Sequence, residues 1–399
     1  MRCARCCKGA AISGFGRGRV LRSPAMSERV LIAMSGGVDS SVAAARLCAQ
    51  GYDVVGVTLH LWDYPDDGSV KSRCCAPEDV HDARRVADLL GIPHYAFDRR
   101  ELFQREVVAP FVESYLEGET PSPCVRCNRG VKIRELFQLA DRLSATHVAT
   151  GHYARVVQNG GHFELHRGRD HGKDQSYFLH MLGQEALSRL LFPLGDSDKP
   201  EIRAEAVKLN LPGAHKGESQ ELCFVPTGRY DAFVAERAPE RVRPGPILDE
   251  RGQQVGEHDG VFRFTLGQRK NLGVALGQRA YVVGVDAETA TVTLGSVDSL
   301  NSSSAELSEV ALAADLSLPL RCEVQVRYRG RPTPAEVRRV GDSVHVFFDE
   351  PQRAVVKGQF AVFFQGERVL GGGMIQAATR APRSEFAGVS SARATESRA

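Results

Sequence analysis

A turn of small and hydroxyl-bearing residues, Ser35-Gly36-Gly37-Val38-Asp39-Ser40-Ser41, has the composition of a phosphate-binding loop. It follows a short apolar run of the buried-strand type and precedes an alanine-rich stretch typical of a helix. A strand, a glycine turn and a helix N-terminus direct backbone N–H groups and the positive end of the helix dipole to one point. Because no lysine follows the glycines, this is not the nucleotide loop that ends in Gly-Lys-Ser/Thr.

The side chains of this turn suit a phosphate that carries a metal ion. The two glycines let the backbone approach closely and adopt positive φ, and the three serines can donate hydrogen bonds. Asp39 is unfavourable beside a bare phosphate but favourable beside a phosphate bound to Mg²⁺. The alternative is an ordinary glycine-rich turn between a strand and a helix.

Three cysteines in the middle of the chain could act as nucleophiles. Cys124-Val125-Arg126-Cys127 is a Cys-x-x-Cys pair, and Cys223 lies in the segment Glu-Ser-Gln-Glu-Leu-Cys-Phe-Val. Alone, such a pair could be a redox centre or half of a zinc site. Beside a phosphate loop it indicates a thiolate that attacks an activated substrate, and a helix N-terminus after Cys127 would lower the pKa of its thiol. Without a secretory signal, we expect the ten cysteines to be thiols in a reducing compartment.

Strands and helices alternate over the first part of the chain. Strands are expected at residues 30–34, 53–61, 94–98 and 147–150, with helices at 42–50, 78–90, 101–116 and 129–143. This alternation predicts an α/β fold with a Rossmann-like parallel sheet, whose ligands bind at the carboxyl ends of the strands. Leu59 is therefore expected against a nucleotide base. Pro121 and Pro123 predict a stiff loop, not a helix, around the Cys-x-x-Cys pair.

The second part of the chain is turn-rich, and short alternating strands dominate from 280 to 375, among them 281–285 and 291–294. Their spacing predicts a small β-barrel. We expect a disordered extension at 1–27, a catalytic domain at 28–225, a small central α/β domain at 226–284, a C-terminal barrel at 285–376 and a disordered tail at 377–399.

Composition limits the class of protein. With 42% hydrophobic and 25% charged residues, the chain is typical of soluble globular proteins. No apolar run approaches the roughly 18 residues of a membrane span. The formal net charge of +2 means that any RNA contact must come from local patches. Residues 1–27 carry six basic side chains and no acidic one. We expect a dispensable extension on a cytoplasmic monomer, with an organelle transit peptide as the alternative.

Together, these motifs resemble the tRNA-specific 2-thiouridylase (MnmA/TrmU) family of ATP pyrophosphatases. The resemblance spans residues 29–375 and rests on seven segments: AMSGGVDSS (33–41), TPSPCVRCN (120–128), ATGHYAR (149–155), GKDQSYFL (172–179), SQELCFV (219–225), GEHDGVFRFTLGQRKNLG (256–273) and VRYRG (326–330). It implies a sulfurtransferase that converts the wobble uridine (U34) in the anticodon loop of tRNA to 2-thiouridine. ATP adenylates the C2 oxygen, releasing pyrophosphate, and AMP leaves as sulfur enters.

The resemblance also implies roles for particular residues. Cys223 would carry the sulfur of an external donor as a persulfide, and Cys127 would be the nucleophile that closes a transient disulfide with it. The residues implied for ATP are Ala33, Met34, Ser35, Gly36, Gly37, Val38, Asp39, Ser40, Leu59 and Gly151. Those implied for the target base are Ser122, Pro123 and Cys124, and those for the rest of the tRNA are His152, Lys173, Asp174, Gln175, Arg327, Tyr328 and Gln359.

Other chemistries fit some of these residues. Cys124, Cys127 and Cys223 could hold an iron–sulfur cluster that binds external sulfide, or a zinc ion with Cys74 or Cys75 as the fourth ligand. We favour persulfide chemistry and expect no resident metal besides the Mg²⁺ of ATP. Two further alternatives are an RNA-binding protein without catalysis and a pyrophosphatase that amidates a small molecule.

Overall fold

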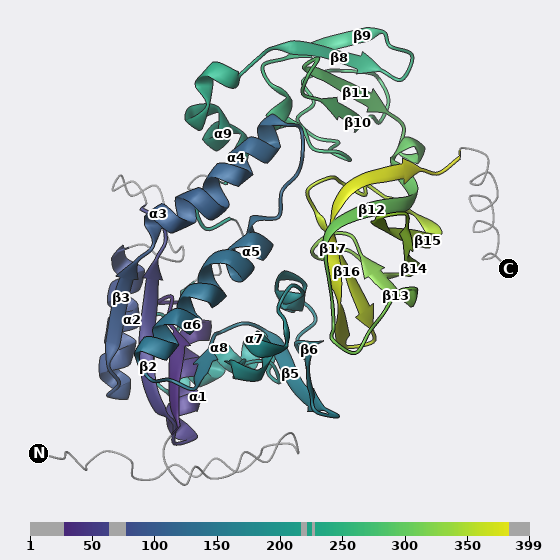
Figure 1. Ribbon diagram of the computed structural model, residues 1–399. Helices are drawn as coiled ribbons and strands as arrows, with labels where there is room; N and C mark the ends of the chain where they lie inside the picture. The colour runs from purple at the N-terminus through teal and green to yellow at the C-terminus, as the bar shows by residue number, and fades with distance from the viewer. Residues whose placement is uncertain (1–27, 64–76, 217–221, 226–227, 383–399) are drawn as a thin grey trace, which may run out of the picture.

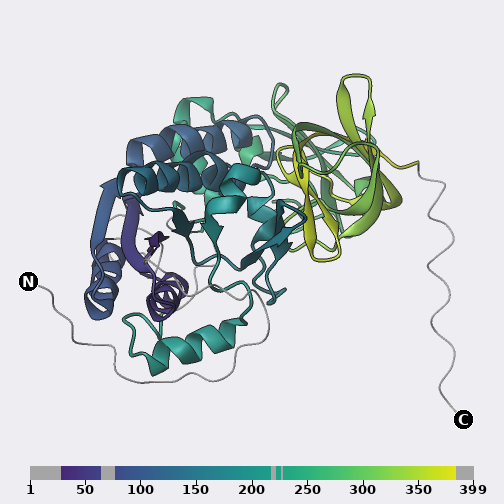
Figure 2. The same ribbon diagram turned by 60° about the horizontal axis from the view of Figure 1, so that its bottom comes forward.

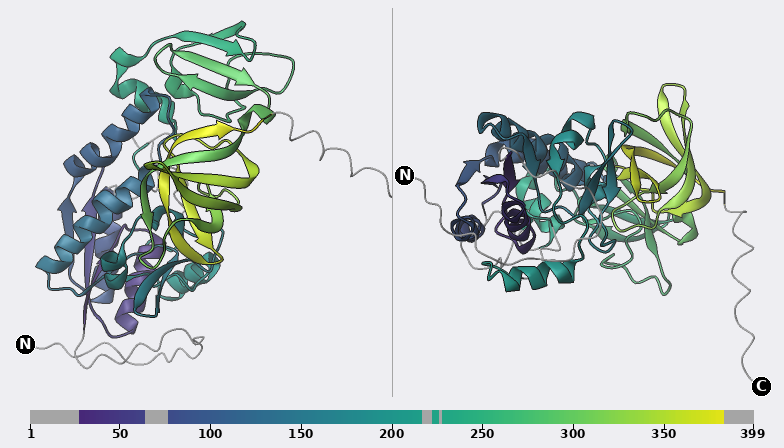
Figure 3. Two further views of the ribbon diagram at one scale, coloured as in Figure 1. Left: turned by 45° about the vertical axis from the view of Figure 1, so that its right-hand side comes forward. Right: turned by 90° about the horizontal axis from the view of Figure 1, so that it is seen from below.

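The computed structural model describes residues 28–63, 77–216, 222–225 and 228–382. Their strands form three sheets, which follow one another approximately along the chain (Figure 1). In Figures 1 and 3 the second sheet along the chain, called the middle sheet below, lies at one end of the molecule. The third sheet lies beside both the first sheet with its helices and the middle sheet. Within these residues no helix combines the length and the apolar character that crossing a membrane requires.

The first sheet is parallel and carries the phosphate loop. Its strands are β1 (Arg29–Ala33), β2 (Asp53–His60), β3 (His94–Asp98), β4 (His147–Ala149) and β7 (Leu190–Leu191), in the order β3-β2-β1-β4-β7. All the pairings are parallel, which confirms the predicted Rossmann-like sheet. The order reverses between β1 and β4, and such a switch point opens a crevice at the carboxyl ends of the strands.

Helices cover both faces of this sheet (Figure 2). On one face α1 (Val38–Ala49), α2 (Pro77–Leu90) and α8 (Lys199–Lys208) share a buried apolar cluster. The other face carries a larger apolar cluster, which includes side chains of α3 (Arg100–Phe103), α4 (Ala109–Leu116) and α6 (Ile133–Arg142). A π-helical segment, η1 (Gln104–Val108), joins α3 to α4.

The loop predicted around the Cys-x-x-Cys pair is instead the start of a helix. Helix α5 (Pro123–Arg126) continues through a π-helical segment, η2 (Cys127–Lys132), directly into α6. Pro123 occupies the first turn, where its missing N–H would have had no helical partner. The prediction of a loop was wrong because proline excludes only the helix interior, and both cysteines of the pair lie within the first two turns.

The segment between the first two sheets carries a hairpin, β5 (Ala154–Asn159) and β6 (His162–Arg167), followed by η3 (Ser176–Leu179) and α7 (Gln184–Arg189). The hairpin joins the third sheet through the pairing of β6 with β17. Helix α9 (Tyr230–Arg237) and the turn η4 (Pro239–Arg241) then lead to the middle sheet. The part of the chain that contains the first sheet, which we call the catalytic unit, is therefore linked to the barrel by backbone pairing as well as by side chains.

The middle sheet contains two strands that the sequence analysis assigned to the barrel. It runs β10-β11-β8-β9, with β8 (Gly245–Asp249), β9 (Gln254–His258), β10 (Tyr281–Asp286) and β11 (Thr291–Gly295), and η5 (Val261–Arg263) precedes β10. Because β11 pairs in parallel with β8, the assignment of residues 281–285 and 291–294 to the barrel was wrong. Alternation along the chain shows that a strand exists, but not which sheet it joins.

The third sheet confirms the predicted barrel. Beside the hairpin β5–β6, the sheet contains the barrel strands β12 (Asn301–Leu312), β13 (Leu320–Gln325), β14 (Thr333–Val340), β15 (Ser343–Arg353), β16 (Phe360–Gln365) and β17 (Arg368–Arg380), preceded by η6 (Asp298–Leu300). Pairing of β12 with β17 closes it. Residues 377–380, predicted to be disordered, instead pair with β12. The domain limits stay a prediction, and the pairing of β11 favours a boundary after Gly295 over one at 285.

Candidate active site

The phosphate loop lies between β1 and α1, and its own side chains fix its shape. Gly36 has φ of +70°, and a Cβ there would lie 2.3 Å from the carbonyl oxygen of Asp79, so only glycine fits. The Ser40 hydroxyl accepts a hydrogen bond from the backbone N–H of Ser35 at 3.1 Å and donates to the carbonyl of Gly37 at 3.1 Å. The loop is thus organised before any ligand arrives.

Gly151 belongs to the same site although it lies far along the chain. It follows β4, and a Cβ at this position would lie 2.9 Å from the backbone nitrogen of Ser40. The ends of β1 and β4 therefore meet at the switch point, as the sheet order requires. Residues 33–40 and Gly151, all implied for ATP, come together here.

Asp39 has partners that sequence reasoning missed. Lys199, the first residue of α8, places its ammonium nitrogen 2.7 Å from both carboxylate oxygens of Asp39. The hydroxyl of Tyr153 donates to Asp39 at 2.8 Å. Lys199 is only 9% exposed, whereas the Asp39 side chain is 34% exposed, so the pair joins a buried ammonium group to a carboxylate at the open side of the loop. The sequence contains no signal for the contact, because 160 residues separate Lys199 from Asp39.

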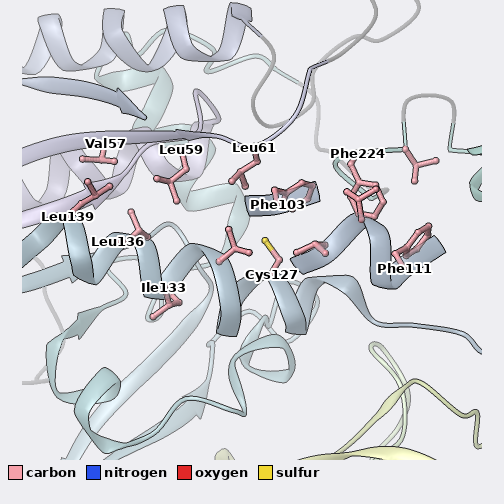
Figure 4. Close-up of a cluster of buried hydrophobic side chains, with 14 of the residues drawn as sticks. Val57, Leu59, Leu61, Phe103, Phe111, Cys127, Ile133, Leu136, Leu139 and Phe224 are labelled. Atoms are coloured by element: carbon pink, nitrogen blue, oxygen red, sulfur yellow. The ribbon is translucent and has the colours of Figure 1, made fainter. Parts of the chain in front are cut away.

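Leu59 points away from the position expected for a nucleotide base. Its side chain lies in the apolar cluster between β2 and α6, near Leu136 and Leu139 (Figure 4). It is 8% exposed, so its side chain contributes to the core. A contact between this residue and ATP would therefore have to use its backbone at the end of β2.

Cys127 and Cys223 lie against the same apolar cluster. Cys127 is 5% exposed, and Figure 4 shows its sulfur near Leu61 and Phe103. Cys223 is half-buried and packs on that cluster, and both residues are thiols in this structure. The two cysteines that sequence reasoning paired therefore share one apolar cluster, and their roles stay a prediction.

Phe224 fixes the chain next to Cys223. Its ring makes edge contacts with Phe111 at 5.0 Å and with Phe103 at 5.6 Å between centroids. It is 1% exposed, and its neighbours Phe103 and Phe111 come from the helix that runs beside α5. These ring contacts fix the backbone next to Cys223 against the helix that carries Phe103 and Phe111.

The residues implied for the target base lie where the barrel braces the active-site helix. Ser122 and Pro123 are buried, and Cys124 is half-buried in the first turn of α5. The side-chain amide of Gln359 donates to the carbonyl oxygens of Thr120 at 2.9 Å and Pro121 at 3.3 Å. Gln359, implied as a tRNA contact, therefore holds the loop that leads into α5.

The segment Lys173-Asp174-Gln175 is mostly engaged within the protein. The Asp174 carboxylate is 6% exposed and accepts hydrogen bonds from the Arg167 guanidinium at 2.9 Å and from the backbone N–H of Ser176 at 3.0 Å. Gln175 accepts from the backbone N–H of Tyr153 at 3.1 Å. Two of these three residues thus shape the turn that presents Lys173.

A cavity of about 540 Å³ brings two segments implied for tRNA together. Asp174 and Tyr177 line one side, and Tyr328 and Arg329 of the barrel line the other. The Tyr328 ring packs on Phe178 with centroids 4.3 Å apart, and the neighbouring Arg327 is exposed. The cavity lies between the catalytic unit and the barrel, away from the phosphate loop.

His152 is neutral near pH 7. Burial, with a smaller effect of the Lys132 charge, lowers the pKa of His152 to about 3. One ring nitrogen, Nδ1, lies 2.7 Å from the Thr150 hydroxyl, and the ring edge meets Phe192. It can pack against a base or accept a hydrogen bond, but it cannot attract a phosphate as a cation.

A metal centre was one alternative for the cysteines. In the part of the chain that the structure describes, no three His, Cys, Asp or Glu side chains are grouped so as to hold a metal ion. Cys74 and Cys75, considered as further zinc ligands, lie outside the described residues.

Comparison with known proteins gives matches over most of the described chain. The tRNA methyl transferase HUP domain model matches residues 28–227, the tRNA methyl transferase PRC-barrel domain model 231–296, and the aminomethyltransferase beta-barrel domain model 302–375. A tRNA-specific 2-thiouridylase MnmA from Sorangium cellulosum is 62% identical over 371 residues, covering 92% of this chain and 96% of that protein. A protein of the same name from Carboxydothermus hydrogenoformans is 48% identical over 356 residues, covering 88% and 98%.

A 4-thiouridine synthetase–RNA complex with bound ATP aligns with 54% of this chain and 51% of its own, at 16% identity and a TM-score of 0.34. A similarity this weak adds no argument about the site.

Proposed function

The chain belongs to the family of tRNA-specific 2-thiouridylases, and on that premise we propose how its residues carry out the reaction. It is a tRNA sulfurtransferase, and 2-thiouridine in tRNA is its product. Its substrates are a tRNA uridine, ATP and sulfur delivered as a persulfide. The proposal is supported above all by the packing of Cys127 and Cys223 on one apolar cluster within the same unit as the phosphate loop.

The phosphate loop activates the uridine. The C2 oxygen attacks the α-phosphorus of ATP, the α–β phosphoanhydride bond breaks, and pyrophosphate leaves with the electron pair while the N3 proton is lost. Residues 33–40 and Gly151 would hold the phosphates through backbone N–H groups at the start of α1. The poor oxygen leaving group is thereby converted to AMP.

The two thiols deliver the sulfur. Cys223 carries it as a persulfide, and the Cys127 thiolate attacks the inner sulfur, so that the persulfide bond breaks and hydrosulfide leaves. Hydrosulfide adds to C2, AMP departs with the oxygen, and a Cys127–Cys223 disulfide remains. An external thiol must reduce this disulfide before the next turnover. Packing of both cysteines on one cluster supports this assignment.

The apolar surroundings of Cys127 favour transfer over hydrolysis. Attack of water on the adenylated base would only regenerate uridine and waste ATP. The aromatic side chains around Cys127 and Cys223, including Phe103 and Phe224, exclude water from this part of the site. Ser122, Pro123 and Cys124 at the start of α5 would receive the target base.

The tRNA would bind across the catalytic unit and the barrel. Arg327 is exposed, and Lys173 and Tyr328 are partly exposed, so these three are the side chains we assign to direct contact. Asp174, Gln175 and Gln359 support the turns that present the site. The sulfur donor would be a persulfide-bearing protein, and the enzyme would act as a monomer.

The side chains around the loop do not favour binding of a metal ion to the Asp39 carboxylate. Mg²⁺ in phosphate-transfer sites is usually bound by one or two carboxylates together with phosphate oxygens. Both carboxylate oxygens of Asp39 instead accept from Lys199. We therefore derive no step through a metal ion held by Asp39.

The decisive experiment supplies ATP, a persulfide donor and unmodified tRNA and measures 2-thiouridine and AMP by nucleoside and nucleotide analysis. Wild type should form both in equal amounts, whereas Cys127→Ser and Cys223→Ser should form no 2-thiouridine beyond the background. Cys322→Ser is the matched control, because burial in the barrel raises the pKa of the Cys322 thiol to about 12 and keeps it protonated. A wild-type protein that binds ATP and tRNA but yields no 2-thiouridine would refute the function.

A further inference from the structure

The phosphate loop, residues 35–41, contains one carboxylate and no basic residue that could balance its negative charge. Asp39 is the second residue of α1, within the turn that must bind a polyphosphate. A carboxylate there repels the phosphates unless a cation balances it. The usual cation would be a metal ion, but the structure provides a different one.

Lys199 supplies that cation from another element. Its ammonium nitrogen lies 2.7 Å from each oxygen of Asp39, and the side chain of Lys199 is 11% exposed. The Asp39 side chain is 34% exposed, so the carboxylate faces the loop while the ammonium group beside it is buried. At this distance the two charges are coupled, and burial of Lys199 reduces their screening by salt. The Tyr153 hydroxyl is a further partner of this carboxylate and donates a hydrogen bond to Asp39 Oδ1 at 2.8 Å.

The position of Lys199 is fixed by the fold. It is the first residue of α8, which Asp198 and Glu201 close with a reciprocal capping box. Its backbone N–H donates to Asp170 at 3.0 Å. Helix α8 packs on α1 through Ile202 and Ala206, so the ammonium group has little freedom to leave the loop.

A second ion pair joins the same two helices and serves as an internal comparison. Arg46, in the last turn of α1, donates to Glu205 of α8 and to the carbonyl of Pro193. Like the Lys199–Asp39 pair, the Arg46–Glu205 pair joins a basic and an acidic side chain of similar burial. It lies at the other end of α1 from the phosphate loop. It can stabilise the packing of α8 on α1 without affecting a ligand at the loop.

We propose that Lys199 is a positioning residue of the ATP site, which neutralises Asp39 so that the triphosphate binds without a metal ion on this carboxylate. The proposal rests on the proposed function, since it concerns the same loop. Lys199 acts through Asp39 and need not touch the phosphates. Any Mg²⁺ that accompanies ATP is then held by the phosphate oxygens alone.

Equilibrium binding of ATP to the full chain tests this with three variants. Lys199→Met should weaken binding at least tenfold, because it leaves an unbalanced carboxylate beside the phosphates. The double variant Asp39→Asn/Lys199→Met should bind ATP within about threefold of wild type, because the neutral amide no longer repels them. Arg46→Met, the matched control, should leave ATP affinity within twofold while lowering the unfolding temperature.

The magnesium dependence gives a second readout. Lys199→Met exposes the Asp39 carboxylate to metal ions, so its ATP affinity should rise more steeply with Mg²⁺ concentration than that of wild type. The double variant, which lacks the carboxylate, should show the wild-type dependence.

Several outcomes would overturn the proposal. A double variant tenfold or more weaker than wild type would mean that Lys199 binds the phosphates directly. Equal losses in Lys199→Met and Arg46→Met would mean that Lys199 only supports packing. If Lys199→Met does not fold, the double variant still decides, since it buries no unpaired charge. Failure of wild type to bind ATP would instead refute the proposed function.

Discussion

The phosphate loop and the thiol site are built in different ways. The loop is one contiguous turn whose serines and glycines bond to one another, and it is polar and balanced in charge. The thiol site is assembled from three distant segments, around Phe103 and Phe111, Cys127, and Cys223 with Phe224, and it is held by apolar packing. We therefore expect the shape of the loop to survive changes in distant apolar residues, whereas its charge balance depends on Lys199 and the thiol site depends on every segment that packs in it.

The largest expected effect tests the assembled site. Phe224→Ala removes a fully buried ring and should lower the free energy of unfolding by about 3–5 kcal/mol. Because Phe224 fixes the chain beside Cys223, formation of 2-thiouridine should fall at least a hundredfold, while the variant that remains folded should still bind ATP. Calorimetry, nucleoside analysis and ATP binding measure these effects. An equal loss of ATP binding would show that the two regions are not independent.

The next effect tests the contiguous loop. Gly36→Ala places a Cβ against the carbonyl of Asp79 at positive φ and should lower the free energy of unfolding by about 2–3 kcal/mol and abolish ATP binding. Gly37 is the matched control for stability, since it is extended and a Cβ there would meet only the Ser35 hydroxyl at 3.5 Å. Gly37→Ala should cost less than about 1 kcal/mol. Equal losses of stability in urea titrations would contradict the predicted role of the positive φ.

A smaller effect links the barrel to the thiol site. Gln359→Ala removes two hydrogen bonds that brace the loop before α5, and it should cost about 1–2 kcal/mol of stability. Thiolation should fall about tenfold in its rate at saturating tRNA, with ATP affinity unchanged. The matched control is Gln352→Ala, whose amide bonds only within the barrel, to Thr333 and Glu350. If Gln359→Ala raised only the KM for tRNA, Gln359 would be a direct tRNA contact instead.

The smallest effect is a pH dependence at the edge of the phosphate site. Burial lowers the pKa of His152 to about 3, below its ordinary value of about 6.5. Between these values the unfolded chain binds a proton that the folded chain does not, so stability falls as the pH drops below about 6.5. The expected slope from His152 is about 1 kcal/mol per pH unit. His152→Asn should flatten it in urea titrations between pH 7 and 5, and an unchanged slope would contradict the predicted effect of burial.

Much of the architecture could be predicted because it depends on local sequence patterns, such as apolar runs, turn glycines and helix starts. The sequence 30–41 has the strand, the turn glycines and the helix start that a phosphate loop needs, and the structure has them in that order. Apolar runs that alternate with helical segments likewise indicated the parallel strands, and short alternating strands indicated the barrel. The prediction of a loop at Pro123 was wrong because proline permits a first helical turn.

The sequence by itself determined the phosphate loop, the candidate thiols and the classes of the two large sheets, because short-range spacing and burial periodicity are sufficient for these. Only the tertiary structure placed Lys199 on Asp39, Gln359 on the loop before α5, and β11 in the middle sheet. These contacts join residues that are distant in the chain. Their partners are decided by how whole elements pack, and the spacing of residues along the sequence does not record that.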